Sequence, residues 1–365
     1  MRIAGWIVVL ILSVAAVLTL NPDWIGVLVP PWAELSTRFP ISQAIAVRAL
    51  PAGAFVLVGV IILIVALVRK IGFRGGNRTL ALALVLVLVG VGHAGYLWTR
   101  GLENPAELGP DRGLRPTEEG DGAITLLTYN TAGGRTTSEE VANLAEQSGA
   151  DVLVLPEAGP EFAEQTASFL ASADETYQIF TRRAPEEQSD SVPGSGDDGE
   201  DERPEFIGHT AVLVSSNLGE YVRNETAQTT LGALRVEPAS GVGPVVVGVH
   251  AAAPVRDQHE EWLGDLETIM ALCGSSGPDG VVVAGDFNAT LDHAPMRDLG
   301  RCVDASVEAG IGGIATWPSN LPQLVGAPID HVLVDAAAYE VGQGRVDEAG
   351  DSDHRGLVVR IRPTT

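Results

Sequence analysis

The hydrophobic pattern divides the chain into two parts near residue 100. Three long apolar stretches lie before that point, at about residues 3–20, 50–68 and 80–98. Each is near the length of about 20 residues that an α-helix needs to cross a bilayer. His93 is their only side chain that can become charged near neutral pH, so helices of a soluble core are a poor alternative. We therefore predict a membrane domain over residues 1–99 with three transmembrane helices.

Beyond residue 121 the pattern changes to short apolar runs, typical of strands, that alternate with helix-like segments. The helical segments are 138–147, 161–171 and 257–272, and Ser138 is a suitable N-cap for the first of them. This alternation predicts an α/β domain over residues 122–362.

Two segments of the second part lack apolar periodicity. Residues 100–121 are rich in Gly, Pro and acidic residues, which is typical of a linker. Residues 184–205 contain too few apolar residues to bury a core and are predicted to form a disordered acidic loop. The carboxylates of this loop lack the fixed spacing of a calcium-binding motif, so solvation is the better explanation.

Polar groups suited to metal or phosphate stand at the ends of the predicted strands. The most informative run is Val281–Asn288, in which an apolar strand ends in an Asp-x-Asn pair. Residues two apart on an extended strand share a face, so Asp286 and Asn288 should point into one cleft. Alone this triplet also forms ordinary Asx turns. The groups occur in the order Asn130, Glu157, His250, Asp286 with Asn288, Asp330, and Asp353 with His354.

That order resembles the endonuclease/exonuclease/phosphatase superfamily over roughly residues 122–362, in a form that looks like a membrane-anchored bacterial member. The resemblance implies a four-layer α/β sandwich, in which two mostly antiparallel sheets face each other and helices flank them. It also implies a metal-dependent phosphoesterase that uses Mg²⁺ or Mn²⁺ and hydrolyses a phosphodiester or phosphomonoester by water attack.

The resemblance also assigns a role to each residue. Glu157 would hold the metal, with Asn130 and Asp353 as further contacts, and Asp286 would orient or deprotonate the attacking water. The remaining residues would act on the substrate: Asn288 donating to a phosphoryl oxygen, His250 protonating the leaving oxygen or holding phosphate, and His354, oriented by Asp330, acting as base or as phosphate-stabilising imidazolium. The alternative is a catalytically inactive membrane-anchored binding domain that retains the fold.

Two departures from the family pattern leave the substrate class open. Many relatives have Gln-Glu where this chain has Pro156-Glu157, and His250 is followed by Ala-Ala-Ala-Pro instead of more polar residues. Trp317 has two interpretations, as a packed aromatic or as part of the substrate cleft. His209, His259, His293 and His331 match no catalytic position and are expected to be structural or exposed.

Charge separates the two parts as sharply as hydrophobicity does. Up to residue 100 the chain has 8 Lys+Arg and 2 Asp+Glu, and beyond it 15 and 45, so the parts carry +6 and −30. The second part has no lysine. Nucleic-acid binding relies on Lys and Arg, so tight non-specific DNA binding is disfavoured. Nucleic acid, phospholipid and small phosphoesters remain as substrates, and no protein partner is expected.

Basic residues predict the orientation of the membrane domain. Arg69, Lys70, Arg74 and Arg78 gather between the second and third apolar stretches, which favours a cytoplasmic loop. The first stretch has no clear signal-peptide cleavage site, so we expect an uncleaved helix. The prediction is a multi-pass protein of the cell membrane with an extracellular catalytic domain. The two cysteines, Cys273 and Cys302, lie in the exported part, as a disulfide or as two buried thiols.

Overall fold

The computed structural model of the chain describes residues 2–73, 76–108, 122–171, 176–184 and 207–364. These residues form two compact units. The first is Met1–Thr99 with Asp292–Ala294, and the second is Arg100–Leu291 with Pro295–Thr365.

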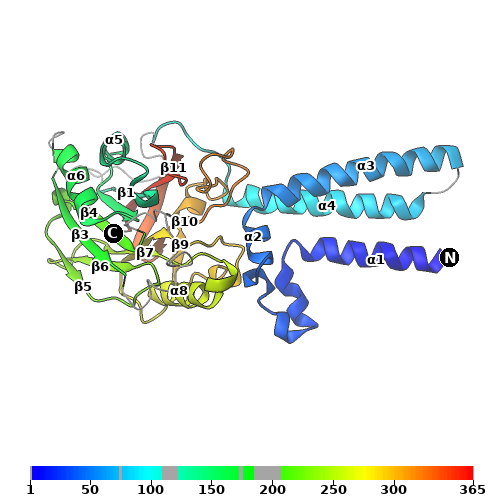
Figure 1. The fold of residues 1–365 in the computed structure, drawn as a ribbon, viewed down its shortest axis with the longest axis horizontal. Coiled ribbons are helices and arrows are strands. Elements are labelled where there is room, and N and C mark those ends of the chain that lie inside the picture. The colour runs from blue at the N-terminus through cyan, green and yellow to red at the C-terminus, as the bar shows by residue number, and fades with distance from the viewer. Residues whose placement is uncertain (1, 74–75, 109–121, 172–175, 185–206, 365) are drawn as a thin grey trace, which may run out of the picture. The chain divides into compact units, whose positions relative to one another are not determined.

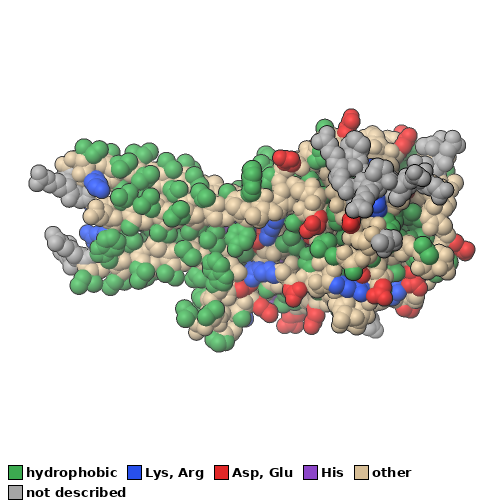
Figure 2. All heavy atoms as spheres, turned by 180° about the vertical axis from the view of Figure 1, so that it is seen from behind, with side chains coloured by type: hydrophobic (Ala, Val, Ile, Leu, Met, Phe, Trp, Pro, Cys, Tyr) green, Lys and Arg blue, Asp and Glu red, His purple; other side chains and the backbone are tan. Residues whose placement is uncertain are grey.

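The first unit is helical (Figure 1). Its long helices are α1 (Arg2–Leu18), α3 (Ala49–Phe73) and α4 (Asn77–Arg100). Short helices between α1 and α3 are η1 (Pro22–Val27), η2 (Pro30–Trp32), η3 (Leu35–Thr37) and α2 (Ile41–Ala46). Figure 2 shows hydrophobic side chains over most of the visible face of this unit. Leu57, Ile61 and Leu88 are among its exposed apolar residues.

Among the described residues, two helices of this unit are long and apolar enough to cross a membrane, not the three that the sequence predicts. They are α3 and α4, whereas α1 has only 17 residues. At 1.5 Å per residue α1 reaches about 25 Å, less than the ~30 Å of a hydrocarbon core. The helix is shorter than the apolar stretch because Asn21 caps a new helix that begins at Pro22.

Small residues let α3 and α4 approach closely. A Cβ added at Gly59 would lie 2.9 Å from the backbone nitrogen of Val87, and one added at Gly90 would lie 2.8 Å from that of Val56. Close backbone approach through small residues is the usual way in which helices associate where water cannot drive them together.

A buried ion pair lies inside the first unit. Arg48, just before α3, is 3% exposed and donates from its Nε to Asp292, which belongs to the same unit, at 2.9 Å. Its guanidinium also lies 3.2 Å from Nδ1 of His93, whose Nε2 is 3.0 Å from Oγ1 of Thr19. The arginine charge is thus paired, as a buried charge requires.

The second unit contains two six-stranded sheets. The first has the order β11 (Tyr339–Asp347), β12 (Gly356–Pro363), β1 (Ile124–Thr128), β2 (Val152–Pro156), β4 (His209–Ser215) and β3 (Tyr177–Arg183). The second has the order β5 (Tyr221–Asn224), β6 (Ala233–Pro238), β7 (Val245–His250), β8 (Val281–Asp286), β10 (Asp330–Asp335) and β9 (Cys302–Asp304). Each has one parallel pair, β1 with β2 and β7 with β8, and its other pairs are antiparallel.

The core of this unit lies in three layers. Inward side chains of both sheets, such as Leu126, Val246 and Val282, pack against one another between the sheets. The outer face of the first sheet is covered by α5 (Ser138–Ser148) and α6 (Pro160–Ala171), and that of the second by α8 (His259–Leu272). The short α9 (Ala305–Glu308) follows β9. The two mixed sheets flanked by helices agree with the α/β sandwich of mostly antiparallel sheets that the family resemblance implies.

Local signals explain where the first of these helices begins and ends. Thr137, one residue before the expected cap Ser138, accepts from the backbone of Glu140, whose side chain accepts in return from Thr137. This capping box places the cap at Thr137 because the glutamate stands three residues after it. Gly149 ends the helix in the left-handed conformation, with φ 62°.

Further sequence expectations concern segments outside the strands. Cys273 and Cys302 form a disulfide. Residues 100–108 of the expected linker belong to the second unit, where the Asn104 side chain is hydrogen-bonded to both backbone groups of Val346. Residues 109–121 and the acidic loop 184–205, apart from Ala184, lie outside the described residues.

Candidate active site

Strand ends from both sheets converge on one cluster of polar side chains. In the second sheet His250 and Asp286 are partners at the ends of parallel β7 and β8, and Asp286 also faces Asp330 at the start of antiparallel β10. In the first sheet Asn130 and Glu157 follow the ends of parallel β1 and β2. Parallel strands end at the same edge, so each pair delivers its polar groups to one place.

Asn130 joins the groups of the two sheets. Its Nδ2 donates to Oε1 of Glu157 at 3.2 Å and to Oδ2 of Asp286 at 3.0 Å. The orientation of the amide is fixed because Oδ1 accepts from the backbone N–H of Ala132 at 2.9 Å. Asn130 therefore turns its nitrogen, not its oxygen, towards the two carboxylates.

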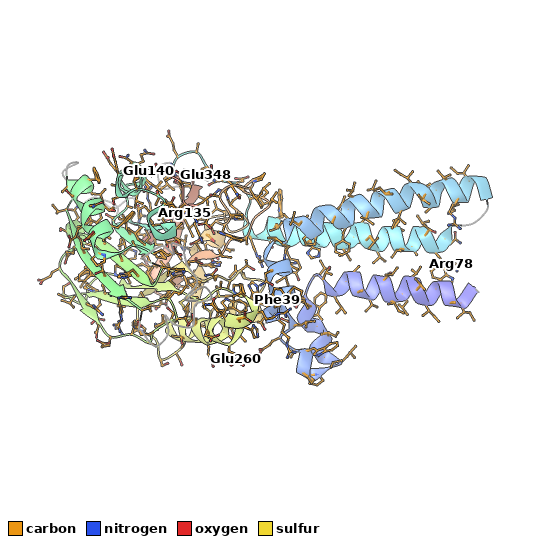
Figure 3. The ribbon with its side chains drawn as sticks, viewed as in Figure 1. Phe39, Arg78, Arg135, Glu140, Glu260 and Glu348 are labelled. Atoms are coloured by element: carbon orange, nitrogen blue, oxygen red, sulfur yellow. A yellow bond between two sulfur atoms is a disulfide. The ribbon has the colours of Figure 1, made fainter. Side chains whose placement is uncertain are left out.

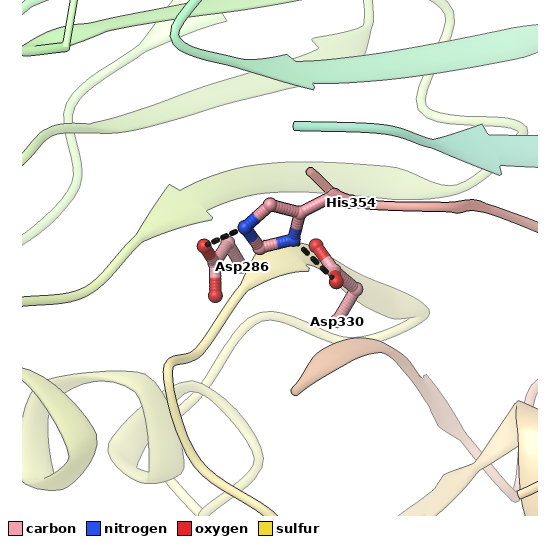
Figure 4. A group of neighbouring side chains, drawn as sticks. All are labelled: Asp286, Asp330 and His354. Atoms are coloured by element: carbon pink, nitrogen blue, oxygen red, sulfur yellow. Dashed lines mark hydrogen bonds and ion pairs between the residues drawn. The ribbon is translucent and has the colours of Figure 1, made fainter. Parts of the chain in front are cut away.

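His354 lies between two carboxylates (Figure 4). Its Nδ1 is 2.9 Å from Oδ2 of Asp330 and its Nε2 is 3.6 Å from Oδ2 of Asp286. Burial alone lowers the pKa of His354, but the Asp330 and Asp286 carboxylates outweigh it and raise the pKa to about 10. The ring is therefore an imidazolium at neutral pH.

His250 differs from His354 in its charge. Its Nε2 is 3.7 Å from Oδ2 of Asp286 and 3.9 Å from Oε1 of Glu157. Burial lowers the pKa of His250 more than the Asp286 carboxylate raises it. This ring is therefore neutral near pH 7 and can offer an N–H without carrying a charge.

The sequence argument assumes that the Asp-x-Asn pair is extended, but in the structure it is not. Strand β8 ends at Asp286, and Asn288 has φ 48°. The backbone N–H of Asn288 donates to Oδ1 of Asp286 at 2.8 Å, and its Nδ2 donates to the carbonyl of Ala251 at 2.9 Å. The two side chains are brought together by an Asx turn, not by the period of a strand.

Backbone strain gathers around this cluster. The described non-glycine residues with positive φ are Ala132, Glu157 and Asn288. Ala132 contacts Asn130, and the other two are predicted site residues. Non-glycine residues in the left-handed region cost free energy and persist mainly where the surroundings over-determine them, often at functional sites.

The carboxylates of the cluster are only partly neutralised. Burial raises the pKa of Glu157, and the Asn130 hydrogen bond, the His354 charge and exposed Arg135 (Figure 3) lower it less. Burial also raises the pKa of Asp286, against the opposing charge of His354. A bound cation would stabilise the ionised form of both carboxylates.

Two sets of residues could contact such a cation. Ligand atoms of Asp286, Asp330 and His354 lie within 4.8 Å of one another. The sequence-predicted set is Glu157 with Asp353, whose negative charge acts on Glu157, and Asn130. Glu157 and Asp353 offer carboxylate oxygens, the ligands that a hard cation prefers. Asn130 turns its Nδ2 towards Glu157, so in this orientation it positions the carboxylate and does not offer an oxygen.

Three further residues support the site, and of these the sequence argument names only Trp317. Ser352 donates to the carbonyl of Asn130 at 2.7 Å and accepts from the backbone of His354 at 3.1 Å. Thr316 Oγ1 accepts from the backbone of Asp330 at 3.1 Å. Trp317 donates its indole N–H to Oδ2 of Asp353 at 3.1 Å. The hydroxyls of Ser352 and Thr316 carry no sequence signal of their own. Trp317, which the sequence argument leaves as a packed aromatic or part of the cleft, is hydrogen-bonded to a predicted site residue.

The other histidines have structural positions. His331 is buried, with Nδ1 2.6 Å from Oδ2 of Asp304 and Nε2 2.9 Å from the carbonyl of Ala289. The backbone carbonyl of His209 accepts from Glu157 at 2.8 Å. These contacts are in keeping with the structural role expected for both residues.

A family model named the endonuclease/exonuclease/phosphatase family matches residues 127–354, more than half of the chain. The chain belongs to this family. The matched region begins in β1 and ends at His354, so it contains every candidate residue of the site. Among curated proteins, none matches the chain.

The solved structures that are similar to this member of the family include the following three. Humanized TDP2 of D. rerio has 16% identity and a TM-score of 0.47, covering 66% of this chain and 99% of its own. An endonuclease/exonuclease/phosphatase from Beutenbergia cavernae has 18% identity and a TM-score of 0.45, covering 66% and 72%. The human Nocturnin catalytic domain has 16% identity and a TM-score of 0.42, covering 67% and 94%. Such identities carry no substrate from those proteins to this one.

Proposed function

We propose that this protein is a membrane-anchored, metal-dependent phosphoesterase that hydrolyses a phosphodiester or phosphomonoester by water attack. The observation that carries the proposal is the convergence of His250, His354 and several carboxylates on one cluster at the ends of strands from both sheets. A binding domain that had lost activity would have no use for His354 held between two carboxylates. The inactive alternative has no comparable support.

Asp286 and His354 have the central roles in this proposal. Asp286 orients the attacking water and accepts its proton, and its raised pKa suits a general base. His354 stabilises the charge that develops on the phosphoryl oxygens, and Asp330 keeps its ring oriented and protonated. The bond from the water oxygen to phosphorus forms as the ester oxygen leaves.

Neutral His250 and Asn288 would complete the contacts to the phosphoryl group. His250 offers an N–H donor from Nε2, the atom that faces Asp286 and Glu157. Asn288 uses one amide hydrogen on Ala251 and has a second for a phosphoryl oxygen. With its lowered pKa, His250 is better suited to holding phosphate than to protonating the leaving oxygen.

Glu157 and Asp353 are the residues that we propose hold Mg²⁺ or Mn²⁺, since a hard cation prefers carboxylate oxygens and keeps several waters. When bound, the ion would neutralise charge on the phosphoryl group and make water more acidic. Asn130 holds the Glu157 carboxylate in position through its Nδ2.

Membrane anchoring rests on α3 and α4. Arg69 and Lys70 lie near the end of α3, and Arg78 lies at the start of α4 (Figure 3), so the basic residues gather where the two helices are joined. Basic loops favour the cytoplasmic side, so α4 would leave the membrane on the outside whether or not α1 crosses it. The Cys273–Cys302 disulfide suits an oxidising exterior. Protease added to intact cells should remove the second unit, and full protection would reverse this orientation.

The proposed hydrolase is tested by comparing the wild-type chain, purified in detergent, with His354→Ala on bis-p-nitrophenyl phosphate and Mg²⁺. Wild type should turn over, and the variant should lose on the order of 10²-fold in kcat. Circular dichroism checks that both are folded. No turnover by a folded wild type, or equal rates in the two proteins, would favour the inactive alternative.

A further inference from the structure

A segment without charged residues, buried over residues 311–316 and largely exposed over 317–325, lies in an otherwise strongly charged domain. Residues 309–329 contain no Asp, Glu, Lys or Arg, although the part of the chain beyond residue 100 has 45 acidic and 15 basic residues. Within this segment Trp317 is 38% exposed, Leu321 42% and Leu324 50%. Large apolar side chains that cluster on the surface indicate a contact with an apolar partner.

The segment is held in a fixed conformation by one buried arginine. Arg355 is 1% exposed and donates from NH1 to the carbonyls of Ala315 and Pro318. Its NH2 donates to the carbonyls of Ser319 and Leu321, both at 2.6 Å. The exposed side chains therefore project from an ordered backbone, so little conformational entropy is lost when they bind.

This segment borders the candidate active site. Trp317 contacts Asp353 through its indole N–H, and Ser319 donates to the carbonyl of Ser352 at 2.7 Å. Arg355 follows His354 directly in the chain. A partner that binds these apolar side chains would therefore lie beside the cluster that contains His354.

The start of the segment is also tied to the end of a proposed membrane helix. Gly312 donates to the carbonyl of Arg100 at 2.9 Å, and Gly313 to that of Gly101 at 2.9 Å. Arg100 is the last residue of α4. The uncharged segment therefore begins beside Arg100 and Gly101, where the second unit begins in the chain.

We propose that residues 316–325 form a membrane-docking loop and that the substrate is a phospholipid, an inference that rests on the proposed phosphoesterase function. Trp317 would lie at the level of the headgroups, where tryptophan is favoured, and Leu321 and Leu324 would enter the acyl region. The phosphoester of a neighbouring lipid then reaches the cluster, where the water oxygen bonds to phosphorus and Asp286 accepts the water proton. The bond from phosphorus to the ester oxygen breaks, and this oxygen leaves as an alcohol that takes a proton from solvent.

The negative charge of the domain determines which kinds of bilayer it can bind. With −30 beyond residue 100, the domain repels nucleic acids and strongly anionic bilayers alike. An uncharged apolar loop binds a zwitterionic phospholipid surface without that penalty. We therefore commit to a zwitterionic bilayer as the occupant.

Docking can be measured without any activity. Both cysteines of the chain are in the disulfide, so a single added cysteine can be labelled selectively with an environment-sensitive fluorophore. Full-length Leu321→Cys and Leu324→Cys would be labelled and reconstituted into phosphatidylcholine vesicles. The matched control is Val242→Cys, 78% exposed and located before β7, at the opposite end of that strand from His250.

The label at residues 321 and 324 should shift to the emission of an apolar environment on reconstitution and resist an aqueous quencher, and the label at residue 242 should do neither. Equal emission and quenching at all three positions would overturn the docking loop. This outcome would leave the proposed phosphoesterase intact, because no catalytic step is measured.

The substrate is tested separately with full-length protein in the same vesicles. Leu321→Ser/Leu324→Ser should lower phosphatidylcholine hydrolysis by about tenfold or more, relative to its own rate on bis-p-nitrophenyl phosphate, and Val242→Ser should leave that ratio unchanged. Hydrolysis of bis-p-nitrophenyl phosphate or single-stranded DNA but not of the lipid would overturn the phospholipid substrate alone. No hydrolysis of any of the three would overturn the proposed function and this inference with it.

Discussion

The two sheets of the sandwich position their site residues by different means. In the second sheet, His250, Asp286 and Asp330 lie inside strands and are fixed by the ladder that pairs β8 with β7 and β10. In the first sheet, Asn130, Glu157 and His354 lie outside the strands, in turns held by side-chain hydrogen bonds. A ladder fixes the backbone, whereas a turn can also reorient its carboxylate around an ion.

This difference suggests a division of labour. The strand residues of the second sheet would act on the water and the phosphoryl group, and the Glu157 turn of the first would hold the metal. His354 belongs to a turn of the first sheet but is bonded to Asp330 of the second, so it links the two. Substitutions on the two sides should therefore give different kinetic signatures.

The largest effect is expected for Asp286→Asn. The neutral amide cannot accept the proton of the attacking water, so kcat should fall on the order of 10³-fold, within the range for acid–base groups. The fold should survive because burial raises the pKa of Asp286, and the substitution removes a desolvated charge. The Mg²⁺ concentration for half-maximal rate should not change. A kcat within a factor of a few of wild type would remove Asp286 from the mechanism.

Asp330→Asn should cost somewhat less, on the order of 10²-fold in kcat, because it loosens the ring of His354 without removing it. Combined with His354→Ala, the loss should be far from multiplicative, since residues that act as a unit are not additive. The measurement is a double-mutant cycle on kcat. Fully multiplicative losses would mean that the two residues act independently.

Glu157→Gln tests the other side of the comparison. A neutral amide is a weaker ligand, so the Mg²⁺ concentration for half-maximal rate should rise by roughly 10- to 100-fold. At saturating Mg²⁺ most of the rate should return, in contrast to Asp286→Asn. A lowered plateau with an unchanged Mg²⁺ midpoint would place Glu157 among the residues that act on the substrate.

The smallest effect concerns the buried pair that braces the second sheet. Burial opposes both charges, but the ion pair prevails, so the pKa of His331 is raised and that of Asp304 is lowered. The histidine contribution to stability is complete below its unfolded pKa of about 6.5 and is lost as pH rises through the higher folded pKa. The aspartate contribution is complete above about 3.9 and is lost as pH falls through the lower folded pKa.

His331→Gln should therefore lower Tm most between about pH 4 and 6.5, with the difference from wild type narrowing at higher pH. Thermal unfolding of both proteins across this range checks the prediction. A Tm difference that stays constant up to pH 9 would mean that the pair is not ionised in the folded protein.

What the sequence can predict about the site also differs between the strand residues of the second sheet and the turn residues of the first. Asp286 and Asp330 could be found because an apolar run ending in an acid marks a strand end, and the order of such ends points to the family. The left-handed backbone of Glu157 and the amide orientation of Asn130 could not, because both depend on contacts with residues distant in the chain.

Two further features escaped the sequence for physical reasons. Nothing in the sequence marks Arg355 as buried, but its guanidinium is enclosed by backbone carbonyls of residues 315–321. The first apolar stretch is long enough by composition to cross a bilayer, but a 3₁₀-helix capped by Asn21 shortens it. Neither the burial of an arginine among backbone carbonyls nor the end of a helix at a local cap can be predicted from amino-acid composition.

The central claim, metal-dependent hydrolysis in this cluster, is tested most directly by the rate of the wild-type chain on bis-p-nitrophenyl phosphate before and after exhaustive chelation. The account predicts turnover with Mg²⁺ or Mn²⁺, loss of turnover with EDTA, and recovery when the ion is restored. A rate that survives chelation would contradict the metal mechanism, and a folded protein without turnover at any concentration of either ion would contradict the enzyme itself.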